Sequence, residues 1–158
     1  MSTPESTPSS YGDAKADLER YCAYQERCQS EVERKMEGMG LRPDERDELL
    51  VDLITSGFLN EERYAKAFVR GKFRSNKWGR YKIRQGLKTK RVSVECIAVG
   101  LQEIDEDEYM NVLRDLIEQK ARSVKDKNTY TRNRKIANYL LQKGFESELV
   151  WEEINAVS

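Results

Sequence analysis

The chain has 158 residues, a length that suits one domain or a short array of repeats. Charged residues make up 35% of it and hydrophobic residues 38%, with only three prolines and nine glycines, so the composition favours helices. The formal net charge is zero, so the total charge predicts no polyanionic partner. Because there is no histidine, the chain lacks the commonest general base and the commonest metal ligand.

The sequence offers little for catalysis. The three cysteines, Cys22, Cys28 and Cys96, form no CxxC pair, and their odd number argues against a disulfide framework. We find no phosphate-binding glycine-rich loop, no metal-ligand spacing and no nucleophile elbow. Asp105 and Asp107 lie in an acidic run, where solvation and helix capping explain them. We therefore expect a protein that is not an enzyme, with no cofactor, metal or small-molecule substrate.

Residues 1–12 are rich in Ser, Thr and Pro and lack the charged and apolar regions of a signal peptide. We expect them to form a disordered tail. No stretch approaches the roughly 18 apolar residues that a membrane span needs. We therefore expect a cytoplasmic protein that does not contact a membrane.

Several helix boundaries can be predicted along the rest of the chain. The segment Ser30-Glu31-Val32-Glu33 fits a capping box, and Pro43 suits the first turn of a helix. Asn60 and Asp105 precede acidic residues that would lie at the positive end of a helix dipole. No segment alternates with period two, so we predict no strand. Helices could end in a left-handed residue at Gly40, Gly57 and Gly144.

One apolar spacing occurs three times. In the middle copy, Ile83 is followed four, eight and nine positions later by Leu87, Arg91 and Val92. The same offsets give two further sets: Val32, Met36, Gly40 and Leu41, and Ile136, Leu140, Gly144 and Phe145. Each set reads as a short helix with one apolar face, a stop, and an apolar residue just beyond it.

The spacing continues into the segment that follows each set. In the middle and third copies the matching positions of that segment are apolar: Cys96, Ile97, Leu101 and Ile104, and Leu149, Val150, Ile154 and Val157. The first copy matches only in its second half, because Glu45 and Arg46 precede Leu50 and Leu53. A further amphipathic segment precedes each set, at residues 14–25, 60–74 and 107–124.

These patterns predict an all-α protein of three tandem three-helix repeats, at residues 13–56, 57–105 and 106–158. Three short helices cannot bury all their apolar faces alone, so stacked copies should form an elongated, curved molecule. The alternative is coincidence, since amphipathic helices share such spacing generically.

The zero net charge hides strong segregation. Residues 13–59 carry −5, residues 60–91 carry +10 from twelve bases and two acids, residues 92–119 carry −7, and residues 120–158 carry +3. A surface as basic as the second block suits a phosphate backbone or an acidic protein groove. Two alternatives stay open: a helix face that is merely solvated, and neutralisation by the neighbouring acidic segments.

The basic block predicts a binding face. On its first helix the cations are spaced by three and four, whereas Tyr64 and Phe68 share another face, which we predict to be the core side. Trp78 either packs as a wedge between helices or makes an exposed contact, and Trp78 or Tyr81 could stack on a base. A weaker cluster in the third repeat, Lys127, Arg132, Arg134 and Lys135, is either an accessory contact or a solvated helix start. The predicted contact residues are Arg63, Lys66, Arg70, Lys72, Arg74, Lys77, Trp78, Arg80, Tyr81, Lys82 and Arg84.

The segment from Gly57 to Val92 resembles the RecX family of recombination regulators. Residues 57–65, GFLNEERYA, are similar to a family segment in which a Gly-apolar-Leu-acid run precedes Arg-aromatic-Ala, and residues 67–70, AFVR, continue it. Residues 78–85, WGRYKIRQ, resemble the family's next segment, with Leu87, Lys90 and Val92 extending the match. Some positions depart from the pattern: Asn60 and Glu61 stand where the family often has two Asp, Gly86 lies mid-helix, and Arg91 replaces the glycine that usually ends this helix.

The resemblance implies an all-α fold of tandem three-helix repeats and no catalysis. It also implies binding to the filament of RecA, the bacterial recombinase, with inhibition of ATP hydrolysis and strand exchange. The basic face would then contact the recombinase, DNA phosphates or both, and we expect the protein to act as a monomer. Two further hypotheses are a helical module that acts on DNA directly and a helical adaptor for an unrelated acidic protein.

Overall fold

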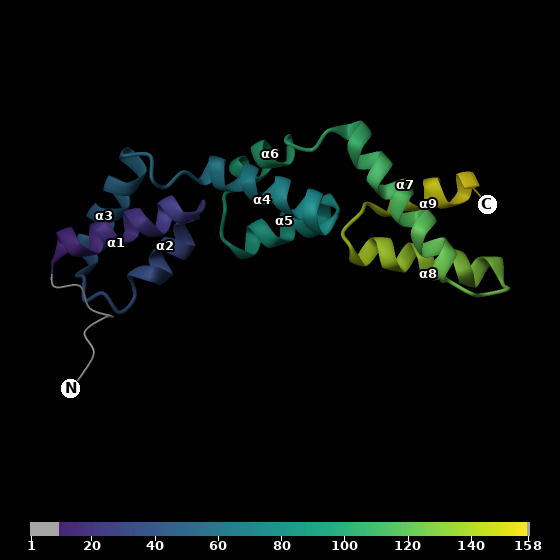
Figure 1. Ribbon diagram of the computed structural model, residues 1–158, viewed down its shortest axis with the longest axis horizontal. Coiled ribbons are helices and arrows are strands. Elements are labelled where there is room, and N and C mark those ends of the chain that lie inside the picture. The colour runs from purple at the N-terminus through teal and green to yellow at the C-terminus, as the bar shows by residue number, and fades with distance from the viewer. Residues whose placement is uncertain (1–9, 158) are drawn as a thin grey trace.

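The computed structural model describes residues 10–157, and all regular structure in that range is helical. The helices form three groups of three that follow one another along an elongated molecule (Figure 1). Repeat 1 comprises α1 (Tyr11–Tyr24), α2 (Gln29–Met36) and α3 (Pro43–Thr55). Repeat 2 comprises α4 (Glu61–Asn76), α5 (Arg80–Thr89) and α6 (Val94–Leu101). Repeat 3 comprises α7 (Glu106–Ser123), α8 (Thr129–Gln142) and α9 (Ser147–Val157). The predicted all-α array of three-helix repeats is confirmed.

The first helix begins earlier than the sequence predicts. Residues 1–9 of the predicted tail lie outside the described residues, but Ser10 is the N-cap of α1, and its hydroxyl accepts a hydrogen bond from the Asp13 amide at 3.1 Å. Between residues 10 and 157, no helix is long and apolar enough to cross a membrane.

Local chemistry explains most helix starts. The side chains of Asn60 and Asp105 cap α4 and α7, each accepting a hydrogen bond from the amide three residues on, and Pro43 is the first residue of α3. These three predictions are confirmed.

The predicted capping box of α2 is wrong by two residues. The N-cap is Cys28, whose amide donates to the Glu31 carboxylate at 3.1 Å. Ser30 lies in the first turn, and its hydroxyl donates instead to the Lys90 carbonyl of repeat 2 at 2.8 Å. Ser30 therefore does not cap α2 but connects repeat 1 to repeat 2.

The backbone confirms the repeat register. The equivalent stop residues Gly40, Arg91 and Gly144 all have positive φ, at 73°, 61° and 99°. Arg91 therefore adopts the left-handed conformation that the register demands, although its side chain makes that conformation costly.

Two apolar cores hold the molecule together. Repeat 1 has a core of its own, whereas repeats 2 and 3 share one continuous core. Phe73 of α4, Tyr109 of α7 and Phe145 before α9 link the two halves of the shared core, with ring centroids 5.8 and 5.1 Å apart. Cys28, fully buried, packs into the shared core from repeat 1.

One predicted core residue lies at its edge. Tyr64 is 6% exposed, but Phe68 is only partly buried, and the central stripe of α4 runs through Ala65, Val69 and Phe73 instead. Phe68 leans toward α5, where a Cβ on Gly86 would lie 2.8 Å from its ring. The absence of a side chain at Gly86 therefore makes room for the phenyl ring.

Candidate partner-binding surface

Part of the predicted basic face is neutralised. Arg63 Nε lies 2.6 Å from a carboxylate oxygen of Glu26 in repeat 1, and Arg70 Nη1 lies 2.8 Å from Glu103 at the end of repeat 2. Lys66 pairs at 3.9 Å with a glutamate one turn earlier on α4. These three cations form ion pairs with acidic residues of the flanking acidic segments or of their own helix.

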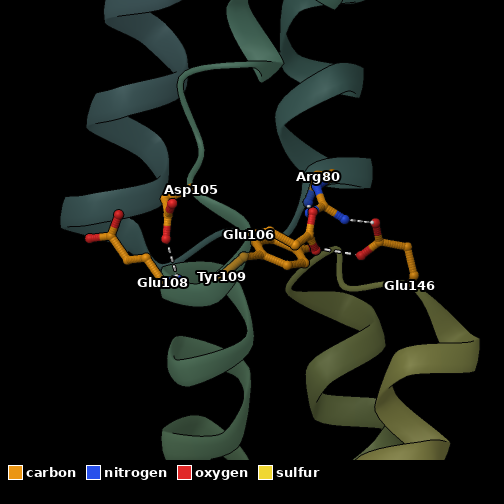
Figure 2. A network of polar contacts seen from close by, with 6 residues as sticks. All are labelled: Arg80, Asp105, Glu106, Glu108, Tyr109 and Glu146. Atoms are coloured by element: carbon orange, nitrogen blue, oxygen red, sulfur yellow. Dashed lines mark hydrogen bonds and ion pairs between the residues drawn. The ribbon is translucent and has the colours of Figure 1, made fainter.

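Arg80 belongs to the junction between repeats 2 and 3. Its side chain is 20% exposed, with Nη2 2.7 Å from Glu106 and Nη1 2.7 Å from Glu146 (Figure 2). The guanidinium also lies 3.9 Å from the centre of the Tyr109 ring, and the Tyr109 hydroxyl donates to Glu146. Arg80 therefore joins repeat 2 to repeat 3 and is not part of the surface that remains available to a partner.

The electrostatics of this junction agree with its geometry. Burial acts against the charge of Arg80, but the hydrogen bonds to Glu106 and Glu146 outweigh it and raise the pKa of the guanidinium. Burial and the hydrogen bond to Glu146 raise the pKa of Tyr109 above its ordinary value. The junction thus brings the Arg80 guanidinium and the Tyr109 phenol against the side chain of Glu146, with Glu106 on the other side of the guanidinium fork.

The backbones of repeats 2 and 3 also touch. The Gly79 amide donates to the Lys143 carbonyl at 2.7 Å, and the Tyr81 amide donates to the Gly144 carbonyl at 2.9 Å. A Cβ on Gly79 would collide with the Gly144 backbone, and one on Gly144 would collide with Lys82. Two glycines are therefore required for this approach.

The junction between repeats 1 and 2 depends more on side chains. Besides the Arg63–Glu26 pair, Lys90 Nζ lies 3.1 Å from Glu31, and the Gln29 amide donates to the Glu61 carboxylate at 2.8 Å. An open cleft of about 530 Å³ separates α2 from the end of α5.

The other predicted cations remain available. Within residues 10–157, five of the predicted contact residues carry charges that form no ion pair: Lys72, Arg74, Lys77, Lys82 and Arg84. They lie on the C-terminal half of α4, on its connection to α5, and on α5. The predicted face therefore divides into a paired part and an unpaired part.

Two aromatic residues accompany the unpaired cations. Trp78 is half-buried, and the Nζ atoms of Lys72 and Lys82 lie 4.8 and 4.7 Å from its ring centre. Tyr81 is exposed, with the Arg84 guanidinium 5.6 Å from its ring. Trp78 packs toward Gly86, and part of the residue reaches solvent, while its contact with a partner stays a prediction.

Sequence reasoning missed residues of repeat 3 that adjoin this surface. Lys143 lies beside Lys82 and Lys77, because its backbone carbonyl bonds to Gly79. It also lies near Tyr139, one turn earlier on α8. Only the three-dimensional approach of Gly144 to repeat 2 brings them there. In the cluster that was predicted in repeat 3, Lys135 pairs with Asp126 at 3.1 Å and Arg132 donates to a backbone carbonyl of α7.

Tandem three-helix repeats define the chain as a helical-repeat protein. The family models for the second and third three-helix domains of RecX match residues 60–101 and 106–154. The chain belongs to the RecX family of regulatory proteins.

Individual relatives agree. The chain is 31% identical to regulatory protein RecX of Clostridium beijerinckii, over 74% of this chain and 57% of that one. It is 27% identical to regulatory protein RecX of Enterococcus faecalis, over 82% of this chain and 49% of that one. The chain thus spans about half the length of these curated relatives.

Solved structures share the fold. A crystal structure of RecX from Lactobacillus salivarius superposes with a TM-score of 0.85 at 23% identity, covering 92% of this chain and 95% of that chain. A second crystal structure of regulatory protein RecX gives a TM-score of 0.82, also at 23% identity, and covers 92% of this chain and 73% of that chain.

Proposed function

We propose that this chain regulates a RecA-type recombinase by binding its filament on DNA and lowering ATP hydrolysis and strand exchange. It does so without catalysis, as a monomer in the cytoplasm, with the recombinase as main partner and DNA as secondary partner. The observation that carries the proposal is the group of unpaired cations on α4 and α5 in a chain of the RecX family.

Physical chemistry supports a polyanionic partner for these cations. Crowded like charges repel one another, which solvent tolerates but which contributes nothing to folding. An acidic protein groove or a phosphate backbone relieves the repulsion and releases counterions. An elongated array of repeats also offers a long surface, which suits a filament better than a compact ligand.

The test is single-stranded-DNA-dependent ATP hydrolysis by the cognate recombinase, measured with and without the chain. The double variant Arg74→Glu with Arg84→Glu reverses two unpaired cations and should abolish inhibition. Arg70 is left unchanged, because its reversal would also break the pair with Glu103. The matched control, Lys35→Glu with Lys125→Glu, makes the same charge change at exposed lysines outside the predicted contacts and should inhibit normally.

A wild-type chain that leaves ATP hydrolysis unchanged while binding bare DNA would favour the second candidate, a module that acts on DNA directly. The lysines around Trp78 are the observation that favours this candidate. Binding to neither recombinase nor DNA would leave the helical adaptor.

A further inference from the structure

Lysines and aromatic rings form a row that crosses from repeat 2 to repeat 3. We call this row the junction track, and its members are Lys72, Trp78, Lys82, Lys143, Tyr139 and Lys120. It begins near the end of α4, passes the start of α5 and the end of α8, and finishes on α7. Half of its members come from each repeat, and three were not predicted from the sequence.

Each ring of the track has two ammonium groups near it. Lys72 and Lys82 approach the Trp78 ring to 4.8 and 4.7 Å, and Lys120 and Lys143 approach the Tyr139 ring to 4.6 and 5.8 Å. Both rings are half-buried, so each is fixed by packing and keeps part of its surface in solvent.

The charges of the track lack the compensation found elsewhere in the molecule. Among residues 10–157, none of its four lysines pairs with a carboxylate, whereas Arg63, Arg70 and Arg80 all do. Lys143 Nζ donates to the Asn76 carbonyl at 3.1 Å. Burial first, and then the nearby charges of Lys82 and Lys77, lower the pKa of Lys143.

The fold holds the two halves of the track in register. The hydrogen bonds from Gly79 to Lys143 and from Tyr81 to Gly144 join the backbones next to Lys82 and Lys143. The Phe73–Tyr109–Phe145 contacts continue the same junction into the core. A ligand that touches both repeats therefore does not have to order them first, and this preorganisation lowers the cost of binding.

We propose that the junction track binds a single strand of nucleic acid, with phosphates on the lysines and bases on Trp78 and Tyr139. Stacking on both rings requires unpaired bases, which a single strand offers and an intact duplex does not. The ammonium groups lie near the rings in the free protein, and a bound strand draws them to its phosphates while its bases stack on the rings. The proposal rests on the regulatory function above, and it assigns the DNA contact of that function to the second junction.

The first experiment measures binding to a fluorescent oligothymidylate by anisotropy at several salt concentrations. The variant Lys82→Gln with Lys143→Gln should lose about two phosphate contacts, so its plot of log affinity against log salt should flatten by about 1.4. The control Lys88→Gln with Lys125→Gln removes two exposed lysines outside the track and should keep the wild-type slope. An unchanged slope in the track variant overturns the proposal.

The second experiment tests stacking. Trp78→Leu should weaken oligothymidylate binding about tenfold, whereas Trp78→Phe, which keeps a ring, should recover most of the affinity. Equal losses in both variants, or equal affinity of the wild type for an intact duplex of the same length, would contradict base stacking. Poly-glutamate serves as a protein-like polyanion: if it binds with the same affinity and the same loss on Trp78→Leu, the track is an acidic-protein site and the proposal is wrong.

Circular dichroism melts show whether each variant folds. If Lys143→Gln destabilises the chain through its bond to Asn76, Lys72→Gln with Lys82→Gln makes the same charge change without it. The two proposals fail differently. A wild type that binds oligothymidylate but does not affect the recombinase contradicts the regulatory function alone. A track variant that binds oligothymidylate with the wild-type affinity and salt dependence contradicts the track alone.

Discussion

The two junctions between repeats occupy equivalent positions, yet they are built differently. In each, the start of one repeat's second helix lies against the end of the next repeat's second helix: Ser30 contacts Lys90 at the first junction, and Gly79 contacts Lys143 at the second. The N-cap is Cys28 in one and Gly79 in the other, and the left-handed stop residue is Arg91 or Gly144.

The difference shows how two small residues decide the nature of an interface. Glycine at both positions lets the backbones of repeats 2 and 3 hydrogen-bond directly. At the first junction Cys28 and Arg91 stand in these positions, and among residues 10–157 no backbone–backbone hydrogen bond joins α2 to α5. Repeats 1 and 2 are instead joined largely by side-chain ion pairs, and exposed ion pairs contribute little to stability. We therefore expect repeats 2 and 3 to unfold as one unit and repeat 1 to open at lower free energy.

The largest effect is expected where the shared core crosses the second junction. Phe145 is 1% exposed and packs on Tyr109, so Phe145→Ala should lower the free energy of unfolding by about 3–5 kcal/mol. Its equivalent at the first junction, Val92, has fewer buried atoms, and Val92→Ala should cost less. Chemical denaturation measures both. A loss below about 1 kcal/mol for Phe145→Ala would mean that repeats 2 and 3 are not joined by this core.

The next effect concerns the glycine contact itself. Gly79→Ala forces a Cβ into the Gly144 backbone and should destabilise the chain by about 1–3 kcal/mol. Gly71→Ala is the matched control, because Gly71 is exposed within α4 with no atom near its missing Cβ, and the same substitution should stabilise by about 0.5–1 kcal/mol. Equal melting temperatures for the two variants would contradict the close backbone approach.

The sequence predicted the repeats well because they rest on local periodicity. The apolar spacing identified Ile83, Leu87 and Val92, all buried, and the stop position that is left-handed in each repeat. It could not separate Phe68 from Val69, because the side of α4 that becomes the core depends on where α5 and α6 pack.

The proposed surface was harder to predict, because charge density does not reveal pairing. Arg70 and Arg74 lie one turn apart on α4, yet only Arg70 meets a carboxylate, 33 residues further along the chain. Arg80 looked like part of the same basic run and is instead held between Glu106 and Glu146 of repeat 3. Such partners are distant in sequence, so only the packing of the repeats brings them together.

At the first junction we expect a smaller effect on the free energy of global unfolding, but a clear effect on the local opening of repeat 1. Arg63→Gln with Lys90→Gln removes the pairs with Glu26 and Glu31 and should lower the free energy of unfolding by about 1 kcal/mol or less per pair. Amide hydrogen exchange should nevertheless rise in α1–α3 and stay unchanged in α7–α9. Raising the salt concentration should have the same effect on the wild type, since it screens exposed charges. Uniform acceleration over all nine described helices would show that the three repeats open together.

The smallest net effect is expected for Arg91→Gly, which gives the first junction the stop residue of the second. Arg91 holds φ at 61°, a conformation that costs a residue with a side chain about 1–2 kcal/mol. Glycine removes that strain, but it is also more flexible in the unfolded chain. This extra flexibility lowers the stability of the folded state by about 0.5–1 kcal/mol. The balance is a stabilisation of a few tenths to about 1 kcal/mol, measurable as a small rise in melting temperature. Gly40→Ala makes the opposite change at the equivalent position of repeat 1, where φ is 73°, and should destabilise. A lower melting temperature for Arg91→Gly would mean that the arginine side chain contributes more to the first junction than its backbone strain costs.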